Sequence, residues 1–537
     1  MNVNAQNKSP LAGVTWYHWL VVIIASSGWL FDCMDQRLFI LARSWALESV
    51  MHEQLVDNFQ SQDSIIAPLA IAHLRQMETN GELTLTNESQ NNLVEKVEAQ
   101  YGGASGADET VNRVLGLIET DLTEIRKVQS LSDVPTLPEL PQSVVRSLVN
   151  NMVDKFGGYA TTSMILGWAT GGIIFGMMSD KYGRVKTMVV TLLTYSLFTG
   201  LSGTSNTWVE FVGYRFLVGL GVGGMFGAAT TLVAESVPAG FRALALGSLQ
   251  ALSATGNIMG SLISLGIPPG QADFFMGFEG WRVLFFVGIL PSILVIPIIF
   301  LLREPEPWKE AVIRAKSGEP SHQMGTIADL FNHPRWRHHA IIGLLFGVSG
   351  MVGLWGIGFF SPELIRNALA GQPQEVVDSV RAWGTALQDV GAFCGMMAVT
   401  FIAAYLSRRL AFLFAFSLSL VITIFVFYSL NDPSDAYWML PMMGFSQLAV
   451  FGCYSIYFPE LFPTRLRGTG VGFCYNTVRY LAAPAPIVLT QLAAVLQNNN
   501  VEESFRVAAV MMSFIYVIGI IAIIWAPETK DRPLPED

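Results

Sequence analysis

Charged residues are scarce in this chain of 537 residues, because Asp, Glu, Lys and Arg together make up only 14% of it. Hydrophobic residues make up 51% and the mean hydropathy is +0.43, values that are far from those of an ordinary soluble enzyme. A chain of this length with so little charge is a multi-span membrane protein. The composition therefore excludes a soluble globular fold.

Cysteine and metal-ligand patterns are also lacking. No two cysteines have a paired spacing, which indicates neither a disulfide framework nor a zinc site. There is no Walker sequence, and one Gly-x-Gly-x-x-Gly match, Gly219 to Gly224, lies inside an apolar run where small residues let helices approach each other. The sequence predicts no metal, no cofactor, no ATP drive, no nucleic-acid partner and no enzymatic site.

The first apolar run, Trp16 to Leu41, carries two carboxylates near its middle, Asp32 and Asp35. A central Asp costs roughly 2.5 to 3.5 kcal/mol on an insertion scale, whereas Leu, Ile, Val and Phe each return only roughly 0.3 to 0.6. The two acids lie three residues apart and share one helical face, so they can point together into a helix bundle. Arg37 is expected to reach the membrane interface instead.

Eleven further apolar runs follow, and with the first they predict twelve membrane spans. A polar stretch between the sixth and seventh runs divides the spans into two halves of six. The expected fold is therefore an all-α membrane protein. The eleven runs are 157–178, 186–205, 208–236, 243–267, 281–302, 340–360, 382–404, 409–430, 436–458, 470–495 and 505–526.

Residues 44–152 interrupt the spans with the polarity of a soluble module. They hold 6 Lys/Arg and 16 Asp/Glu, so this one segment accounts for the net charge of −10 of the whole chain. Val111, Val114 and Ile118 fall at helical spacing and predict a small, mostly helical insertion.

The short loops with Lys and Arg all lie on one side of the predicted spans, and the positive-inside rule makes that side cytoplasmic. The acidic insertion then faces outward, and both termini face the cytoplasm of a cell (inner) membrane. We expect these parts: 1–43, N-terminus and helix 1; 44–152, outer insertion; 153–302, helices 2–6; 303–339, cytoplasmic linker; 340–526, helices 7–12; 527–537, cytoplasmic tail.

The two halves repeat. A Glu-x-x-Pro-x-x-x-Arg sequence runs from Glu235 to Arg242 and recurs from Glu460 to Arg467, 225 residues later. The same offset places Arg184 on Arg409. A duplicated six-helix unit is typical of secondary transporters that bind substrate between their halves.

The loop between spans 2 and 3 reads Gly176-Met-Met-Ser-Asp180-Lys181-Tyr-Gly183-Arg184. This loop resembles the Gly-x-x-x-Asp-(Arg/Lys)-x-Gly-Arg loop of the major facilitator superfamily. The resemblance implies twelve helices in two pseudo-symmetric halves and a cytoplasmic gate. The residues assigned to that gate are Gly176, Asp180, Lys181, Gly183, Arg184, Glu235, Arg242, Arg408, Arg409, Glu460 and Arg467. In the second half Tyr405 stands where the Asp would be.

Two more sequences resemble branches of that superfamily. Glu460 to Gly468 and the closing Pro527-Glu-Thr-Lys530 are similar to sugar porters and metabolite–proton symporters. The first span is similar to the Asp-Gly-x-Asp pattern of aromatic-acid–proton symporters, with Cys33 in place of the Gly.

Ionisable residues inside membrane spans are functional candidates by default. We expect Asp32, Asp35 and Asp389 to carry coupling protons. Residues expected to bind substrate come from spans 2, 4, 7, 8 and 11: Trp168, Arg215, Trp355, Gln388, Tyr475, Asn476 and Arg479.

The sequence thus predicts a monomeric secondary transporter that works by alternating access in the lipid bilayer and moves a small polar metabolite, with proton-coupled symport of an organic anion as the first hypothesis. Two alternatives stay open. The chain could be a sugar–proton symporter, or a membrane sensor whose acidic outer module binds a ligand.

Overall fold

Helices dominate the computed structural model of the protein. It describes residues 11–51, 66–79, 87–101, 109–125, 142–316, 323–369, 372–499 and 501–536. Eleven helices among these residues are long and apolar enough to cross a membrane. A twelfth, α9 (Ala239–Gly266), has the length of a span but is rich in Ala, Gly and Ser, which lowers its hydropathy. The predicted twelve-helix architecture is confirmed.

The first six spans run through the first half of the chain. The sixth has three consecutive segments, with Gly288 following the first and Pro291 near the start of the second, which is a 3-10 helix. Their bounds are α1 (Trp16–Val50), α6 (Gln142–Tyr182), α7 (Arg184–Ser202), α8 (Trp208–Ser236), α9, and the segments α10 (Gly280–Val287), η3 (Leu290–Leu294) and α11 (Val295–Leu301).

Six spans also form the second half, with α12 (Glu306–Ala315) and α13 (Ile327–Asn332) between the halves. A short 3-10 turn, η5 (Gly358–Phe360), and α15 (Ser361–Ala368) follow the seventh span. The spans are α14 (Pro334–Gly356), α16 (Gln374–Tyr405), α17 (Arg408–Ser429), α18 (Pro433–Leu461), α19 (Arg467–Asn476) with α20 (Val478–Ala482) and α21 (Ala485–Asn498), and α22 (Ser504–Ser513) with α23 (Ile515–Ala522).

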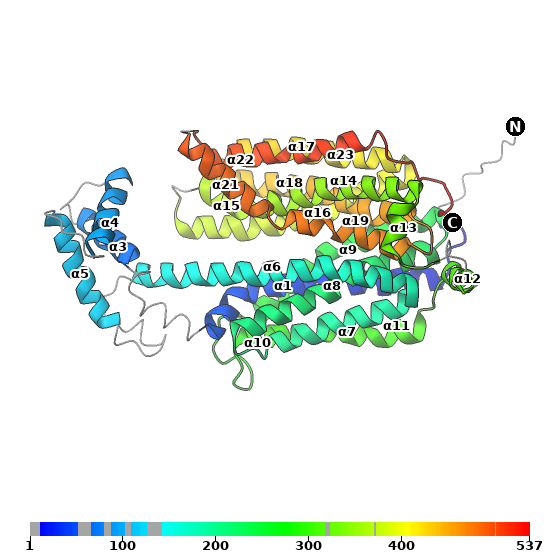
Figure 1. The fold of residues 1–537 in the computed structure, drawn as a ribbon, viewed down its shortest axis with the longest axis horizontal. Coiled ribbons are helices and arrows are strands. Elements are labelled where there is room, and N and C mark those ends of the chain that lie inside the picture. The colour runs from blue at the N-terminus through cyan, green and yellow to red at the C-terminus, as the bar shows by residue number, and fades with distance from the viewer. Residues whose placement is uncertain are drawn as a thin grey trace. The chain divides into compact units, whose positions relative to one another are not determined.

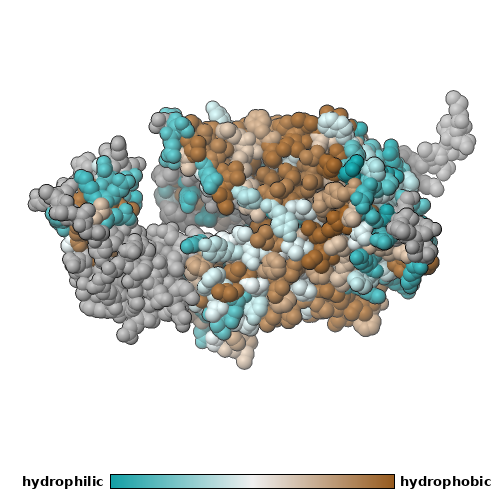
Figure 2. All heavy atoms as spheres, in the orientation of Figure 1, coloured by the Kyte–Doolittle hydropathy of each residue, from teal (hydrophilic) through white to brown (hydrophobic). Residues whose placement is uncertain are grey.

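The chain forms two compact units. The larger unit, residues 1–41, 161–204 and 212–537, holds the helix bundle (Figure 1). Its two ends differ, because α12 and α13 lie at one of them, which we call the linker end. Hydrophobic side chains cover much of the bundle's face in Figure 2, and hydrophilic residues gather at the linker end. This is the surface of a bundle that sits in lipid.

The smaller unit comprises residues 42–160 and 205–211. Its three separate helices pack on one another: α3 (Ile66–Thr79), α4 (Asn87–Tyr101) and α5 (Glu109–Ile125). Leu69, Leu74, Val97 and Val114 are buried among them. The helical spacing read from Val111, Val114 and Ile118 corresponds to the buried face of α5. The helices of the first and second spans run on into this unit, since α1 ends at Val50 and α6 begins at Gln142.

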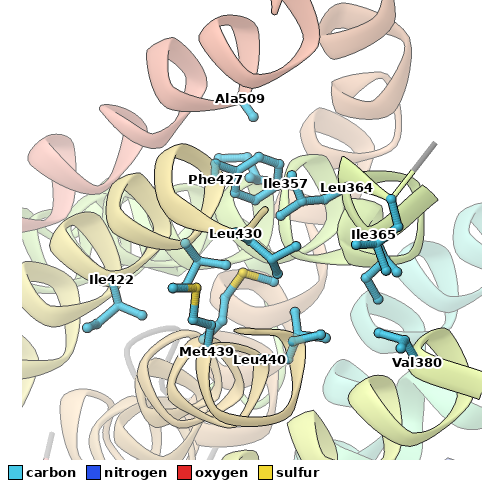
Figure 3. Packing of buried hydrophobic residues seen from close by; sticks show 14 of the residues in the cluster. Ile357, Leu364, Ile365, Val380, Ile422, Phe427, Leu430, Met439, Leu440 and Ala509 are labelled. Carbon is cyan, nitrogen blue, oxygen red and sulfur yellow. The ribbon is translucent and has the colours of Figure 1, made fainter. Parts of the chain in front are cut away.

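The second half has an apolar core at the end of the bundle opposite the linker (Figure 3). Ile357, Phe427 and Leu440 are completely buried there, and Ala509 of α22 closes one side. This core holds α15, α16, α17 and α18 in place around the site.

Two helices of the second half touch backbone to backbone. A Cβ at Gly391 or Gly395 of α16 would come within 2.0 Å of the Pro441 or Phe445 carbonyl oxygen of α18. A Cβ at Gly444 would in turn meet the Gln388 carbonyl oxygen at 2.0 Å. Only glycine allows this approach, so α16 and α18 form one tightly joined pair.

Candidate substrate and coupling site

The interior of the first half buries two acids and one arginine. Asp32 and Asp35 of α1 and Arg215 of α8 have no exposed surface. Arg215 Nη1 lies 3.9 Å from Asp35 Oδ2, and Arg215 Nη2 donates to Ser202 Oγ at 2.5 Å. Its guanidinium also lies over the ring of Phe285, 4.7 Å from the centroid. A buried charge needs such partners, because its desolvation is costly.

The carboxylates themselves are incompletely satisfied. Among the described residues, no hydrogen bond reaches either oxygen of Asp32 or Asp35. Hydroxyl groups of α7 lie next to them, Tyr195 beside Asp32 and Thr199 beside Asp35. Leaving carboxylate oxygens unsatisfied in a dry interior is costly, so these two acids are candidates for binding a proton.

A second cluster surrounds Arg479, in the short helix α20. Its Nη1 donates to the Tyr475 carbonyl oxygen at 2.6 Å and to Asn476 Oδ1 at 2.8 Å. The guanidinium carbon lies 3.9 Å from the ring centroid of Trp168 and 4.6 Å from that of Tyr475. The arginine is therefore held between two aromatic rings that belong to different halves of the chain.

Further rings complete an aromatic cage, which we define as Trp29, Trp168, Phe226, Trp355 and Tyr475. Trp168 packs edge to face on Trp355, with centroids 6.4 Å apart. Phe226 stacks on Tyr475 at 3.9 Å, and Trp29 lies 4.9 Å from Phe226. Sequence reasoning missed Trp29 and Phe226. Trp29 lies one turn before Asp32 on the same face of α1, which could have indicated it.

Several polar atoms in the cage lack partners. Arg479 Nε, Trp168 Nε1 and Trp29 Nε1 are buried, and no described residue accepts a hydrogen bond from them. Asn476 joins the two halves, because its Nδ2 lies 3.5 Å from the carbonyl oxygen of Gly223 in α8. Three unpaired N–H donors around aromatic faces suit a ligand with acceptor oxygens and a flat apolar body.

Two residues of α16 have other neighbours. Gln388 Oε1 accepts from Ser361 Oγ at 2.9 Å, which ties α16 to α15. Asp389 interacts with Asn257 of α9 and with the charge of Arg37. The expectation that Arg37 extends to the membrane interface is wrong, because Arg37 Nε donates to Ser261 Oγ at 2.9 Å in the bundle. The close contact of α1 with α9 at Gly260, where a Cβ would meet Arg37 Cβ at 2.9 Å, directs the arginine there.

The linker end holds a network of buried charges that joins the halves. Arg184 of α7 pairs with Glu235 of α8 at 2.9 Å, and Arg408 of α17 pairs with Glu460 of α18 at 2.9 Å. Arg467 crosses between the halves and meets Glu235 at 2.5 Å. The Nε atoms of Arg242 and Arg467 donate to equivalent carbonyl oxygens, at 3.0 Å and 2.9 Å. The two copies of the repeated sequence therefore make equivalent contacts in the two halves.

The register of this repeat differs by one residue from the sequence alignment. The offset of 225 places Arg184 on Arg409, yet Arg408 makes the equivalent pair. Arg184 and Arg408 are each the first residue of their helix, whereas Arg409 Nη2 is 3.5 Å from the Ile524 carbonyl oxygen near the surface. The turn before the helix sets which arginine points inward.

Asp180 adds a contact that the second half lacks. Its carboxylate accepts from the backbone N–H groups of Gly468 and Thr469 at 2.9 Å and 2.8 Å and from Thr469 Oγ1 at 2.7 Å. These N–H groups belong to the first turn of α19, where a helix attracts negative charge. A Cβ at Gly176 would come within 2.6 Å of the Gly468 carbonyl oxygen, so the two helices are in direct contact.

The turn at Gly183 accepts a carboxylate from beyond the sixth span. Gly183 has φ 116°, a conformation that favours glycine, and a Cβ there would collide with Glu304 Oε1. Glu304 accepts from the N–H groups of Arg184 and Val185 at 2.8 Å and 3.0 Å. Lys181 lies nearby and lines an open cavity of about 410 Å³ with Lys316 and Met324, away from the aromatic cage. The described residues contain no cluster of His, Cys, Asp or Glu that could hold a metal.

Comparisons with known proteins define the class. The Major Facilitator Superfamily profile matches residues 142–486, and the chain belongs to that family of membrane transporters. Over 384 residues, covering 71% of this chain and 88% of the relative, it is 29% identical to the Cis,cis-muconate transport protein of Acinetobacter baylyi. It is 28% identical to the Sialic acid transporter NanX of Escherichia coli, over 60% of this chain and 74% of that one.

A solved structure shares the fold. The proton:xylose symporter XylE, bound to 6-bromo-6-deoxy-D-glucose, superposes with a TM-score of 0.61 at 15% identity, covering 96% of this chain and 98% of that one. The protein is therefore a multi-pass membrane transporter of small molecules and not an enzyme.

Proposed function

We propose that the protein is a proton-coupled symporter of a small organic anion with a flat, unsaturated body. The observation that carries this proposal is Arg479, a buried cation between Trp168 and Tyr475 whose Nε has no acceptor among the described residues. A carboxylate of the substrate would accept from that atom, and the aromatic cage would hold the body of the substrate by stacking. The muconate transporter carries a carboxylic acid by name, and sialic acid is a sugar that bears a carboxylate, so both names agree with an anion over a neutral sugar.

Asp32 and Asp35 are proposed to bind the coupling proton. Arg215 lies beside Asp35 rather than in the aromatic cage, so we assign it to coupling and not to substrate binding. Symport of one proton with a monoanion moves no net charge, so the pH gradient alone would drive accumulation, about tenfold for each pH unit. The linker-end network is proposed as the cytoplasmic gate that opens when the halves rock.

Uptake into proteoliposomes tests the coupling. With a pH gradient, the wild-type protein should accumulate a radiolabelled unsaturated carboxylate such as muconate, and Asp32→Asn and Asp35→Asn should not. Exchange of labelled for unlabelled substrate at equal pH should persist in at least one of the two variants, because exchange needs no net proton movement. Accumulation by the double variant with unchanged pH dependence would show that the aspartates are structural.

The same preparation separates the alternatives. Accumulation of a neutral sugar in place of acids would favour a sugar symporter, and ligand binding without any flux would favour a sensor.

The proposed topology, with both termini in the cytoplasm of an inner membrane, is tested by Asn431→Cys and Lys186→Cys in intact cells. A membrane-impermeant thiol reagent should label only position 431. We propose a monomer, to be checked by the mass of the protein in detergent.

A further inference from the structure

The loop between α9 and α10 ends in an ordered hairpin with an apolar tip. Phe274 N donates to the Phe278 carbonyl oxygen at 2.9 Å, and Phe278 N donates to that of Phe275 at 3.0 Å. Asp273 Oδ1 caps the turn by accepting from Gly277 N at 3.1 Å. The loop projects beyond α10 in Figure 1. We call residues 273–278 the apolar finger.

The tip displays large apolar side chains that the bundle does not cover. Phe275 is 59% exposed and Met276 is 81% exposed. Met276 also has φ 54°, a region that side chains with a Cβ rarely occupy, and Gly277 follows with φ 84°. Polar residues and glycine are usual at such positions in tight turns. An exposed methionine held in this strained conformation therefore indicates a functional role for its side chain.

The base of the finger is polar and well anchored. Gly280 N donates to the Gln271 carbonyl oxygen at 2.8 Å, and Glu279 accepts from Trp281 Nε1 at 2.9 Å and from Arg282 Nε at 3.0 Å. Arg282 Nη1 in turn donates to the Gly203 carbonyl oxygen at 3.0 Å, at the end of α7. The finger is thus amphipathic, with charges at its base and apolar residues at its tip.

The finger contacts the sixth span at its base. Phe278 packs edge to face on Phe286 of α10, with centroids 5.5 Å apart. Because Phe286 belongs to α10, this contact holds Phe278 against the sixth span. Below Phe286 the same segment presents the apolar surface of the sixth span, whose exposed side chains are Ile289, Leu290, Ile293, Ile296, Ile299 and Phe300. The apolar surface of the finger continues this lipid-facing surface.

The other half shows that such a tip is not needed to join these helices. The equivalent loop, between α21 and α22, has the short polar sequence Asn-Asn-Val-Glu-Glu at residues 499–503. The α17–α18 loop at the same end is also polar, with Asn431 and Asp432 at its tip. The apolar finger is therefore a specific addition to the first half.

We propose that the apolar finger inserts into the interfacial region of the lipid bilayer beside α10 and anchors this corner of the first half. Aromatic residues and Met with a polar base suit the boundary between head groups and acyl chains. The continuous apolar surface from Phe278 to Phe300 favours lipid over a second protein as the occupant.

Fluorescence quenching tests this insertion in the full-length protein. Met276→Cys and, as a matched control in a polar loop, Asn431→Cys are labelled with a bimane group after Cys394→Ser removes the exposed native thiol. The label sites are checked by mass spectrometry. The proteins are placed in nanodiscs of phosphatidylethanolamine and phosphatidylglycerol, with phosphatidylcholine that carries a nitroxide on its head group or high on its acyl chain.

Nitroxide lipids should quench the label at position 276 at least about threefold more than the label at position 431, and aqueous iodide should show the reverse order. Phe275→Cys should behave like Met276→Cys, which guards against a local distortion of the turn. Quenching of both finger labels by iodide alone would place the finger in water and overturn the proposal. Protection from both quenchers would also overturn it, because it would place the finger against protein.

Discussion

The two six-helix halves share an architecture but differ in what their interiors hold. The first half buries Asp32, Asp35 and Arg215 between its first, third and fourth spans. In the equivalent spans of the second half, the buried charges Arg408 of α17 and Glu460 of α18 pair with each other at the linker end. Elsewhere between these two spans, Gln447 Nε2 donates to Thr423 Oγ1 at 3.0 Å, a contact between neutral groups. Because intramembrane charge is costly, this difference indicates a division of labour in which the first half holds the completely buried acids and the second half supplies the cage cation, Arg479.

The two halves also differ in their charged contacts at the linker end. Both halves hold an arginine–glutamate pair in the same geometry, but the first half adds a second carboxylate, Asp180, that accepts hydrogen bonds from the other half. At the corresponding place the second half has Tyr405, which is exposed. The acids that contact the opposite half, Asp180 and Glu235, therefore both belong to the first half, and the repeat does not duplicate Asp180.

The largest expected effect comes from removing Arg215, the cation beside the buried acids of the first half. Arg215→Leu leaves Asp35 buried without its cation and should lower the free energy of unfolding by about 3 to 5 kcal/mol. Gln447→Leu, the matched change in the second half, removes one neutral hydrogen bond and should cost about 1 to 3 kcal/mol. Thermal unfolding in detergent measures both. Equal losses would contradict the division between the interiors.

Loss of the cage cation should come next in size. Arg479→Gln removes a charge-assisted contact with a substrate carboxylate, so the Kd for the anion should rise by about 10-fold to 150-fold, equivalent to about 1.5 to 3 kcal/mol. Isothermal titration on purified protein measures it. The control is Arg506→Gln, since Arg506 is also buried but donates to the carbonyl oxygens of Tyr428 and Leu430, outside the cage. If Arg506→Gln raised the Kd as much as Arg479→Gln, the aromatic cage would not be the substrate site.

A third change tests the one-sided contact at the linker end. Asp180→Asn keeps the shape but weakens three hydrogen bonds to the first turn of α19, a change of about 1 to 3 kcal/mol in favour of the open linker end. Spin labels on Lys186→Cys and Leu410→Cys, at equivalent places in the halves, should then report longer distances. Tyr405→Phe is the control and should leave the distance distribution unchanged. No shift in Asp180→Asn would mean that the arginine–glutamate pairs hold the end closed alone.

Two carboxylates that cap equivalent helices sharpen the comparison further. Burial raises the pKa of Glu304 despite the N–H groups of Arg184, Lys186 and Val185 that donate to it. Burial also opposes ionisation of Glu528, but hydrogen bonds from Ser407 and from the N–H groups of Lys530, Arg409 and Arg408 outweigh it and lower the pKa. A depressed pKa stabilises the fold above the ordinary Glu range, about pH 4.3, and that contribution is lost as the pH falls through the folded value.

At neutral pH, Glu528→Gln should therefore lower the Tm, and the difference from wild type should shrink on acidification. Glu304→Gln should leave the Tm unchanged or raise it, because a raised folded pKa means that ionisation of Glu304 opposes folding as the pH rises. Melting curves across the pH range check both variants. The same sign of effect in both at neutral pH would contradict the assignment.

The smallest effect is expected for the insertion, which only the first half carries. Replacing residues 52–141 with a Gly/Ser linker keeps α1 and α6 whole and removes three helices that pack on one another. Substrate exchange should stay within about twofold of wild type, since a flexible linker can join the two ends. Loss of exchange with normal membrane levels would make the insertion part of the transport cycle.

Much of this architecture could be predicted from the sequence, because hydropathy and the Glu-x-x-Pro-x-x-x-Arg repeat depend on local composition. Twelve spans and two halves follow from them, even though α9 is only weakly apolar. The register of Arg408 could not be predicted, since it depends on where the turn at Ser407 starts the helix. Trp29 and Phe226 were missed because an aromatic residue in a span has no pattern that separates packing from ligand contact.

The contacts of the charged residues were the hardest to foresee. Three-residue spacing places Asp32 and Asp35 on one face, but it does not say that Arg215 meets Asp35 while Arg479 meets Trp168. Arg37 shows the same limit, since the side chain is long enough for either the interface or Ser261. Only the packing of α1 on α9 decides between them.

The backbone contact between α16 and α18 makes these helices behave as a lever. With Gly391, Gly395 and Gly444 in the contact, neither helix can slide or turn without the other. The 29 residues of α18 correspond to a rod of about 44 Å, so a tilt of about 10° would displace one end by about 7 Å. Asp389 sits near the middle of this lever and Glu460 at its tip. A small movement beside Asp389 would therefore produce a larger displacement at the Arg408–Glu460 pair.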